Sequence, residues 1–131
     1  MNLQEYDKGV QDTNLMDDNF LYFFLGIMSE VGETAKALAS EDRRIASIIN
    51  QVIDIGNLAG IYKKRMRDHG EVYHYEVDVE EAKREIMDQY WYLPMQAIAL
   101  GSTSEEMVSN LLKKLQDRKV RDVLKGSGDF R

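Results

Sequence analysis

Residues 20–33 read FLYFFLGIMSEVGE, an apolar run that ends in two glutamates. From Phe20 to Met28 every residue is apolar or glycine, so a helix formed by this stretch is apolar on all sides. A second stretch of this kind follows Asp88 and begins with Tyr90–Leu93. Helices that are hydrophobic all round are normally buried, so we expect both of these in the core.

The remaining sequence also favours helices. The chain has one proline and nine glycines, helix-forming residues dominate between them, and no segment shows the sustained period-two alternation with β-branched residues that is typical of strands. The sequence therefore predicts an all-α, four-helix-bundle-like domain with a short N-terminal helix and an irregular C-terminal tail. The expected helices run from Leu3 to Gln11, from Asp17 to Ala39, from a Ser40 cap to Arg67, from Asp78 to Gly101, and from a Ser102–Ser104 cap to Leu124.

Local signals place the ends of these helices. Asp17 or Asp18 is expected to cap the second helix, and His69-Gly70 to end the third. Residues 71–77 are expected to form a loop, and residues 126–131 an irregular tail. Pro94 lies inside the fourth helical pattern, where its ring costs a backbone hydrogen bond. We expect a kink there, and the alternative is a helix that ends at Leu93 and restarts.

Length and composition limit the possible classes of protein. A chain of 131 residues and 15.1 kDa is expected to form one domain, residues 1–131. Its net charge of −6 and pI near 4.9 disfavour nucleic-acid polymers as partners. The absence of cysteine excludes disulfides, thiolate nucleophiles and Cys-ligated zinc. The apolar run from Phe20 to Met28 is too short to span a bilayer. We therefore expect a soluble, cytoplasmic protein with no membrane partner.

Acidic residues three positions apart share one helix face and can share a cation. The spacing alone does not discriminate, because 23 acids in 131 residues produce several such pairs by chance. Asp68/Glu71 straddles a turn and Asp78/Glu81 lies at a helix start, where negative charge is favoured by the helix dipole. The other two pairs lie in the helices that we expect to be buried. These are Glu30/Glu33 and Glu85/Asp88.

Buried carboxylates need a cation or a proton, because leaving them unpaired costs roughly 2 to 7 kcal/mol. Glu30, Glu33, Glu85 and Asp88 together offer only oxygen ligands, which suit Mg²⁺ or Mn²⁺. The alternative is that Lys and Arg neutralise them as buried ion pairs. A di-iron bundle needs two Glu-x-x-His motifs, and the chain has only Glu71-x-x-His74. We reject a di-iron site and place both histidines on the surface.

The end of the chain is basic. Lys114, Arg118 and Arg121 share one face of the last helix, and Gly126–Asp129 and Arg131 follow. Successive backbone N–H groups in such a tail can hold an anion, whereas the alternative is a solvated charged stripe. The run from Lys63 to Arg67 is interpreted as a solvated helix end that benefits from the helix dipole.

With these motifs, the chain resembles the MazG-like, all-α nucleoside triphosphate pyrophosphohydrolases. Glu30-Val31-Gly32-Glu33 is similar to the family's Glu-x-Gly-Glu motif, and the segment from Glu85 to Leu93 is similar to Glu-Leu-Gly-Asp-x-x-Trp-Tyr-Leu. The segment from Lys114 to Arg131 is similar to the Lys-Leu…Arg…Gly-Ser-Gly-Asp-Asn-Arg ending of one subgroup. Tyr6 and Thr13 also match that subgroup. The resemblance covers most of the chain outside residues 40–62.

The resemblance implies an oligomeric helical enzyme that cleaves a nucleoside triphosphate to the monophosphate and pyrophosphate. It implies Mg²⁺ at the two acidic pairs. We expect Lys114, Arg118, Arg121 and Arg131 to hold phosphate, with Lys114 and Arg118 acting in catalysis. Glu33 is the expected base, and Tyr92 the expected nucleoside contact. The alternative function is a non-catalytic helical bundle that binds a partner protein and keeps the acids as ion pairs.

Several residues depart from the family pattern. Met87 and Pro94 replace a usual Gly and Ala, Leu111 replaces an Asn, and Phe130 replaces an Asn of the tail. The gap between Glu33 and Glu85 is longer than usual, as if a helix had been inserted. Within it, residues 54–59 faintly echo residues 30–35, so Asp54 and Asn57 are an alternative to Glu30 and Glu33 at the metal. We prefer the glutamates because they are better cation ligands.

Overall fold

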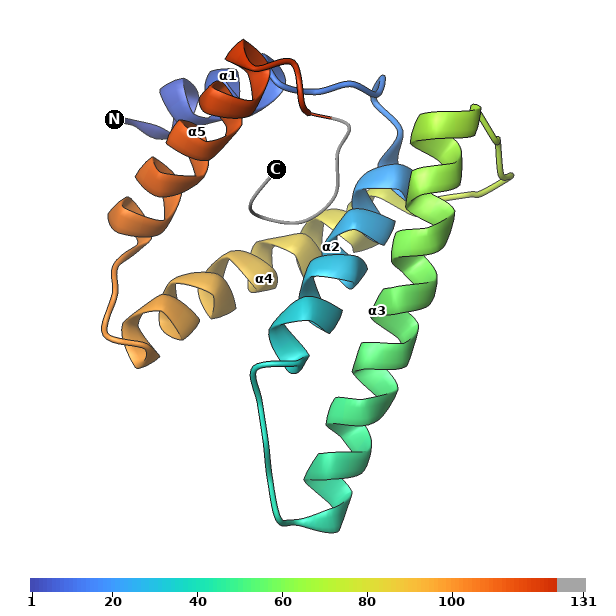
Figure 1. The fold of residues 1–131 in the computed structure, drawn as a ribbon, viewed down its shortest axis with the longest axis vertical. Helices are drawn as coiled ribbons and strands as arrows, with labels where there is room; N and C mark the ends of the chain where they lie inside the picture. Colours follow the sequence, from blue (N-terminus) through green and yellow to red (C-terminus); the bar gives the residue numbers. More distant parts are fainter. Residues whose placement is uncertain (125–131) are drawn as a thin grey trace. The chain divides into compact units, whose positions relative to one another are not determined.

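The computed structural model describes residues 1–124, which form five helices and no strand (Figure 1). The all-α class expected from the sequence is confirmed. The predicted tail, with Arg131 and the Gly126–Asp129 segment, lies outside the described residues. The helices are α1 (Leu3–Gln11), α2 (Phe20–Ala35), α3 (Arg43–His69), α4 (Val79–Ala99) and α5 (Ser104–Val120).

The first two helices begin at asparagine caps. Asn2 and Glu5 form a capping box at the start of α1, whose predicted bounds are confirmed. The cap of α2 is Asn19, which accepts a hydrogen bond from the Tyr22 N–H at 3.0 Å, so the predicted Asp17 or Asp18 cap is wrong. This helix also ends earlier than expected. After Ala35 the backbone makes i→i−3 hydrogen bonds, and this tighter turn ends the α-helical pattern.

Helix α3 is capped by Asp42 rather than by Ser40. The Asp42 carboxylate accepts hydrogen bonds from the Arg44 and Ile45 N–H groups, while the Ser40 hydroxyl accepts one from the Asp42 N–H. A hydrogen bond from the Arg44 side chain and those from the backbone lower the pKa of Asp42. The helix ends at Gly70, which adopts the left-handed φ of 64°, as the sequence predicted.

Helix α4 begins after the Asp78 cap and continues through Pro94 to Ala99. The alternative of a helix that ends at Leu93 is therefore wrong. Residues 71–77 form no helix, as predicted. Helix α5 begins after Thr103, whose hydroxyl accepts a hydrogen bond from the Glu106 N–H at 3.1 Å. It ends at Val120 and not at Leu124, because Asp122 takes a left-handed φ of 57° that interrupts the helix.

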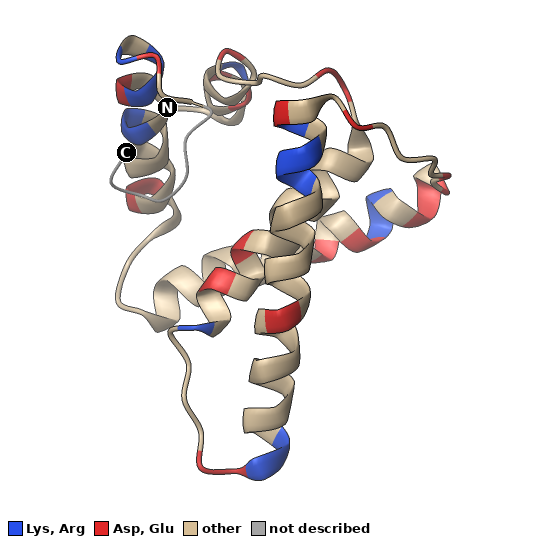
Figure 2. Ribbon diagram, turned by 45° about the vertical axis from the view of Figure 1, so that its right-hand side comes forward, with Lys and Arg blue, Asp and Glu red and all other residues tan. Residues whose placement is uncertain are grey.

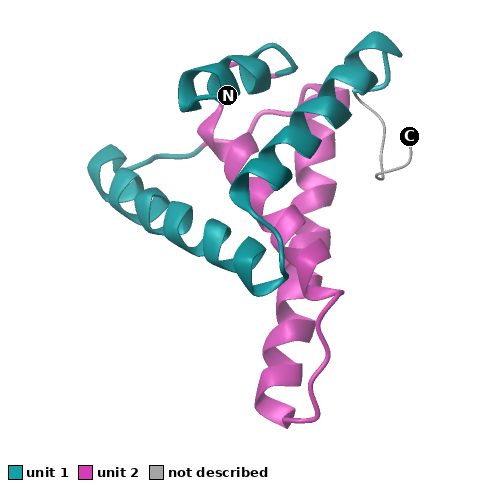
Figure 3. Cartoon of the chain, turned by 90° about the vertical axis from the view of Figure 1, so that its left-hand side faces the viewer, with its two compact units in different colours: residues 1–15, 75–131 teal, residues 16–74 magenta. Residues whose placement is uncertain are grey.

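The chain divides into two compact units (Figure 3). Unit 1 comprises Met1–Leu15 and Tyr75–Arg131, and unit 2 comprises Met16–His74. In unit 2, α2 and α3 pack along each other as an antiparallel hairpin. In unit 1, α5 contacts both α1 and α4.

Few side chains are buried. Among the described residues, the buried hydrophobic ones are Ala35, Ala59, Met66 and Ala97. Ile27 on α2 is 48% exposed and Trp91 on α4 is 61% exposed. The expectation that both apolar helices are buried is therefore wrong for the single chain. Each helix has neighbours on part of its circumference, so a helix that is apolar all round leaves apolar faces in solvent.

Helix α3 is long and apolar enough to cross a membrane by length and composition alone, with 17% of its most apolar window buried. This is weak evidence, because a core helix of a soluble protein can pass the same test. The polar residues Asp54 and Asn57 lie near its middle. The cytoplasmic location expected from the sequence stays a prediction.

Candidate functional site

The two helices of unit 2 touch through their backbones at Gly32 and Gly56. Both glycines are buried, and a Cβ atom built on Gly56 would lie 2.6 Å from the Gly32 Cα atom. That separation is too short for any side chain, so the crossing requires glycine on both helices. These are the glycines of the two segments that echo each other in the sequence, residues 30–35 and 54–59. The two similar segments therefore contact each other through these glycines.

A hollow of about 130 Å³ lies beside this crossing. Gly60 forms part of its wall, and a Cβ atom there would lie 3.1 Å from the Ser29 hydroxyl oxygen. Glu33 and Asn57 both line this hollow, although the sequence presented their segments as alternatives. The lining residues are Ser29, Glu33, Gly56, Asn57, Gly60, Ile61 and Lys64.

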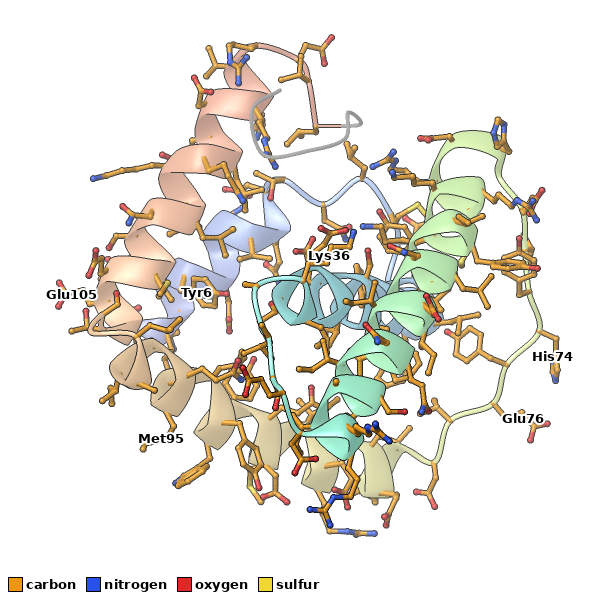
Figure 4. The ribbon with its side chains drawn as sticks, turned by 60° about the horizontal axis from the view of Figure 1, so that its bottom comes forward. Tyr6, Lys36, His74, Glu76, Met95 and Glu105 are labelled. Atoms are coloured by element: carbon orange, nitrogen blue, oxygen red, sulfur yellow. The ribbon has the colours of Figure 1, made fainter. Side chains whose placement is uncertain are left out.

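The first acidic pair lies on α2 and is exposed. Glu33 accepts a hydrogen bond from the Lys36 ammonium, with 3.0 Å between Oε1 and Nζ. Figure 4 shows Lys36 directly after the end of α2. Surface ion pairs of this kind contribute only about 0 to 1 kcal/mol, so a stronger ligand can displace the lysine. Glu30 lies one turn earlier, and its carbonyl oxygen accepts a hydrogen bond from the Thr34 hydroxyl at 2.9 Å.

The second acidic pair, Glu85 and Asp88, lies on α4 in unit 1 and is also exposed. Asp88 lines an open depression of about 370 Å³ together with Trp91 and Tyr92. The two aromatic rings meet edge to face, with 5.0 Å between their centroids. A carboxylate and two aromatic side chains thus share one surface, which includes the residue expected to contact the nucleoside.

The exposure of the four carboxylates corrects one step of the sequence argument. They were expected to need a cation because they were expected to be buried, and in the single chain they are not. Among residues 1–124, no group of three or more His, Asp or Glu side chains comes together as metal ligands within either unit. Each unit contributes one acidic pair, and the four-carboxylate metal site stays a prediction.

The basic face of α5 is not the uniformly solvated charged stripe that was the alternative interpretation. Arg118 is only 5% exposed. Among the described residues, it is the one charged residue that is buried. The chain turns back after α5, so that the Val123 N–H donates to the Arg118 carbonyl oxygen at 2.9 Å. Arg121 is exposed, and its Nε donates to Asp117 at 2.9 Å. Lys114 is exposed.

The basic run lies at the C-terminal end of α3 (blue in Figure 2). Its side chains have different surroundings. The Arg65 guanidinium lies over the Tyr62 ring at 5.1 Å. Arg67 is largely buried and makes two hydrogen bonds to Asp68, which raise the pKa of the arginine. Lys64 instead lines the hollow between α2 and α3. The interpretation of the whole run as a solvated helix end is therefore wrong for Arg67.

Tyr22 lies near this end of the hairpin. Burial raises the pKa of its phenol, with a smaller opposing effect from Arg67. The ring of Tyr22 meets that of Phe23 edge to face, with 5.7 Å between centroids.

Sequence reasoning missed the contribution of Lys64 and of the glycine crossing to this site. The available signal was the similarity of residues 54–59 to residues 30–35, in which Gly56 takes the place of Gly32. The basic run begins two helical turns after Gly56. Comparisons with protein-family models, with curated proteins and with solved structures found no match to this chain.

Proposed function

We propose that this protein is a Mg²⁺-dependent pyrophosphohydrolase of nucleoside or deoxynucleoside triphosphates. The observation that carries the proposal is the depression on α4, where Asp88 lies beside Trp91 and Tyr92. A carboxylate can hold a divalent cation, and the aromatic faces can stack on a base. A volume of about 370 Å³ falls within the range of small-molecule sites. The resemblance of residues 85–93 to a MazG-like motif supports the same chemistry.

The proposed ligands of the cation are Glu30, Glu33, Glu85 and Asp88. Their chemistry fits Mg²⁺, with Mn²⁺ as a substitute, because all four donors are hard oxygen atoms. Mg²⁺ held by these carboxylates would supply Lewis-acid chemistry, namely polarisation of the α-phosphate and a lower pKa of the water that replaces pyrophosphate at the α-phosphorus. Glu33 is the proposed base that accepts the proton of this water. The exposed position of its carboxylate supports this role, because substrate and water can reach it.

The basic residues of α5 are proposed to stabilise the pyrophosphate as it leaves. Negative charge builds up on the leaving group, and positioned cations act where it develops. Lys114 is exposed and suited to direct contact. Arg118 lies on the same helix but is buried. We therefore propose that it acts as a cation held in a fixed position beside the phosphate-binding face. Arg121 can release Asp117 to bind phosphate, since an exposed i,i+4 pair is weak.

We further propose that the protein works as a homo-oligomer. Large apolar residues are exposed on α4, among them Tyr90 at 64% and Leu93 at 61%. Figure 4 shows Met95 projecting away from the same helix. Exposed apolar surface on this scale is characteristic of association. The same surface favours the second candidate function, in which a non-catalytic helical bundle binds a different partner protein and keeps its acidic residues as ion pairs.

Pyrophosphate release from a panel of ribonucleoside and deoxynucleoside triphosphates tests the proposed function. We expect at least one nucleotide to give the monophosphate and pyrophosphate with Mg²⁺ present and no product with EDTA. Asp88→Asn should abolish the activity, whereas Asp78→Asn, which changes a helix cap of α4, should retain it. Absence of pyrophosphate release from every nucleotide, with a protein that still associates, would favour the binding protein instead.

A further inference from the structure

The hollow between α2 and α3 has the chemistry of an anion subsite. Ser29 offers a hydroxyl and Asn57 an amide, both of which can donate hydrogen bonds, and Lys64 offers an ammonium group. The wall between them includes Gly56 and Gly60, which leave room because they carry no side chain.

The order of these groups along the hairpin follows from its antiparallel pairing. Gly32 faces Gly56, and Ser29 faces Gly60, so Glu33 and Asn57 lie at the crossing while Lys64 lies further along α3. Asn57 and Lys64 are two turns apart, or about 10.5 Å along the helix axis. An acidic group thus stands at one end of the hollow and a cation toward the other.

Lys64 differs from the neighbouring cations of the basic run. Arg65 lies over the Tyr62 ring and Arg67 is bonded to Asp68. Within residues 1–124, Lys64 makes no ion pair, and it is the cation of this run that lines the hollow. It is therefore available to a ligand without breaking a contact of the fold.

The size of the hollow restricts the ligand. A volume of about 130 Å³ is well below the roughly 300 Å³ at which sites for whole small-molecule ligands begin. One phosphate group fits such a space, whereas a nucleoside does not. Glu33 alone would repel a phosphate, but a divalent cation on this carboxylate removes the repulsion.

We propose that the hollow is a subsite for one phosphate group of the nucleotide, with Lys64 as its cation and Ser29 and Asn57 as hydrogen-bond donors. This inference rests on the proposed function, because it takes the phosphate to be part of the substrate and Glu33 to hold Mg²⁺. It adds α3 to the elements that bind the substrate, although the resemblance to known pyrophosphohydrolases does not extend over most of this helix.

Calorimetric titration with inorganic pyrophosphate, in buffer that contains Mg²⁺, tests the subsite without relying on turnover. Lys64→Met removes the charge and keeps the length of the side chain, and we expect it to weaken pyrophosphate binding about ten-fold, as for the loss of one charge-assisted contact. Arg44→Met is the matched control, because it removes one positive charge from the same helix about 30 Å away. Mn²⁺ binding should be unchanged in both variants.

The outcomes separate this inference from the proposed function. Wild-type protein that binds no pyrophosphate at millimolar concentration would overturn the subsite, and so would equal binding by Lys64→Met, or equal losses in both variants. If the wild type and Lys64→Met release pyrophosphate from nucleotides equally well, the subsite is refuted and the function stands. If pyrophosphate binding depends on Lys64 but no nucleotide is hydrolysed, the subsite stands and the function is refuted.

Discussion

The two units of the molecule bury their apolar surface in different ways. In unit 2, glycines bring α2 and α3 into backbone contact, and Ala35, Ala59 and Met66 are buried. In unit 1, Ala97 is the buried hydrophobic residue among those described, and large side chains of α4 remain exposed. The hairpin thus owes its geometry to small residues at one crossing, while α4 carries more apolar surface than its own unit covers.

This difference indicates separate roles for the two units. A crossing fixed by backbone contact holds polar groups of both helices beside one hollow. An apolar helix with exposed aromatic rings is suited to contacts outside its unit.

The glycine crossing should give the largest effect on stability. Gly56→Ala places a Cβ atom against the backbone of Gly32, and overpacking of this kind costs up to about 3 kcal/mol, reduced by about 1 kcal/mol of helix propensity. Gly26→Ala is the matched control, because its Cβ atom would lie 3.6 Å from Lys63 Cδ, an ordinary contact. We expect the free energies of unfolding of the two variants in urea to differ by about 3 kcal/mol. Equal free energies of unfolding for the two variants would refute the close backbone contact between Gly32 and Gly56.

Arg118 should affect both activity and folding. Arg118→Ala is expected to lower kcat/KM by about 10², equivalent to about 2.7 kcal/mol of transition-state stabilisation. Its burial adds a loss of stability of about 1 to 3 kcal/mol, which the sequence alone did not predict. Activity is therefore measured well below the melting temperature.

The exposed Arg121 serves as the comparison for this arginine. Arg121→Ala should lower activity while changing stability by no more than about 0.5 kcal/mol. Full activity in Arg118→Ala, in protein shown by circular dichroism to be folded, would remove Arg118 from the mechanism, and full activity in Arg121→Ala as well would count against the basic face of α5.

The helices were predictable because helix-forming residues and stop signals act locally, although the caps of α2 and α3 were placed one or two residues too early. The capping box at Asn2 fixes α1, and the left-handed Gly70 ends α3. The end of α5 was missed because it depends on the conformation of Asp122, a residue type that only occasionally adopts a left-handed φ.

The site was less predictable because it depends on which surfaces meet. The sequence identified Asp88 and Tyr92 on one helix, where a spacing of four residues fixes their common face. It could not show that Gly32 meets Gly56, since that contact joins residues 24 positions apart on different helices. The burial of Arg118 likewise could not be read from the spacing of charges along α5.

Tyr22 should give the smallest effect, a change in the pH dependence of stability. Burial raises the pKa of Tyr22, so the folded state holds the phenolic proton more tightly than the unfolded state does. Stability from this group is therefore complete below the unfolded pKa of about 10 and falls as the pH rises above it. Tyr22→Phe should lose stability less steeply above pH 10 in thermal melts. An unchanged slope would contradict this assignment.

Mn²⁺ binding followed by electron paramagnetic resonance tests the central claim most directly, because each unit carries one of the acidic pairs. We predict that the wild type binds Mn²⁺ and that Glu33→Gln in unit 2 and Asp88→Asn in unit 1 each weaken binding at least ten-fold. Glu41→Gln, in the turn before α3, should bind as the wild type does. Binding that survives either substitution, or a wild type that binds no Mn²⁺, would contradict a shared metal site.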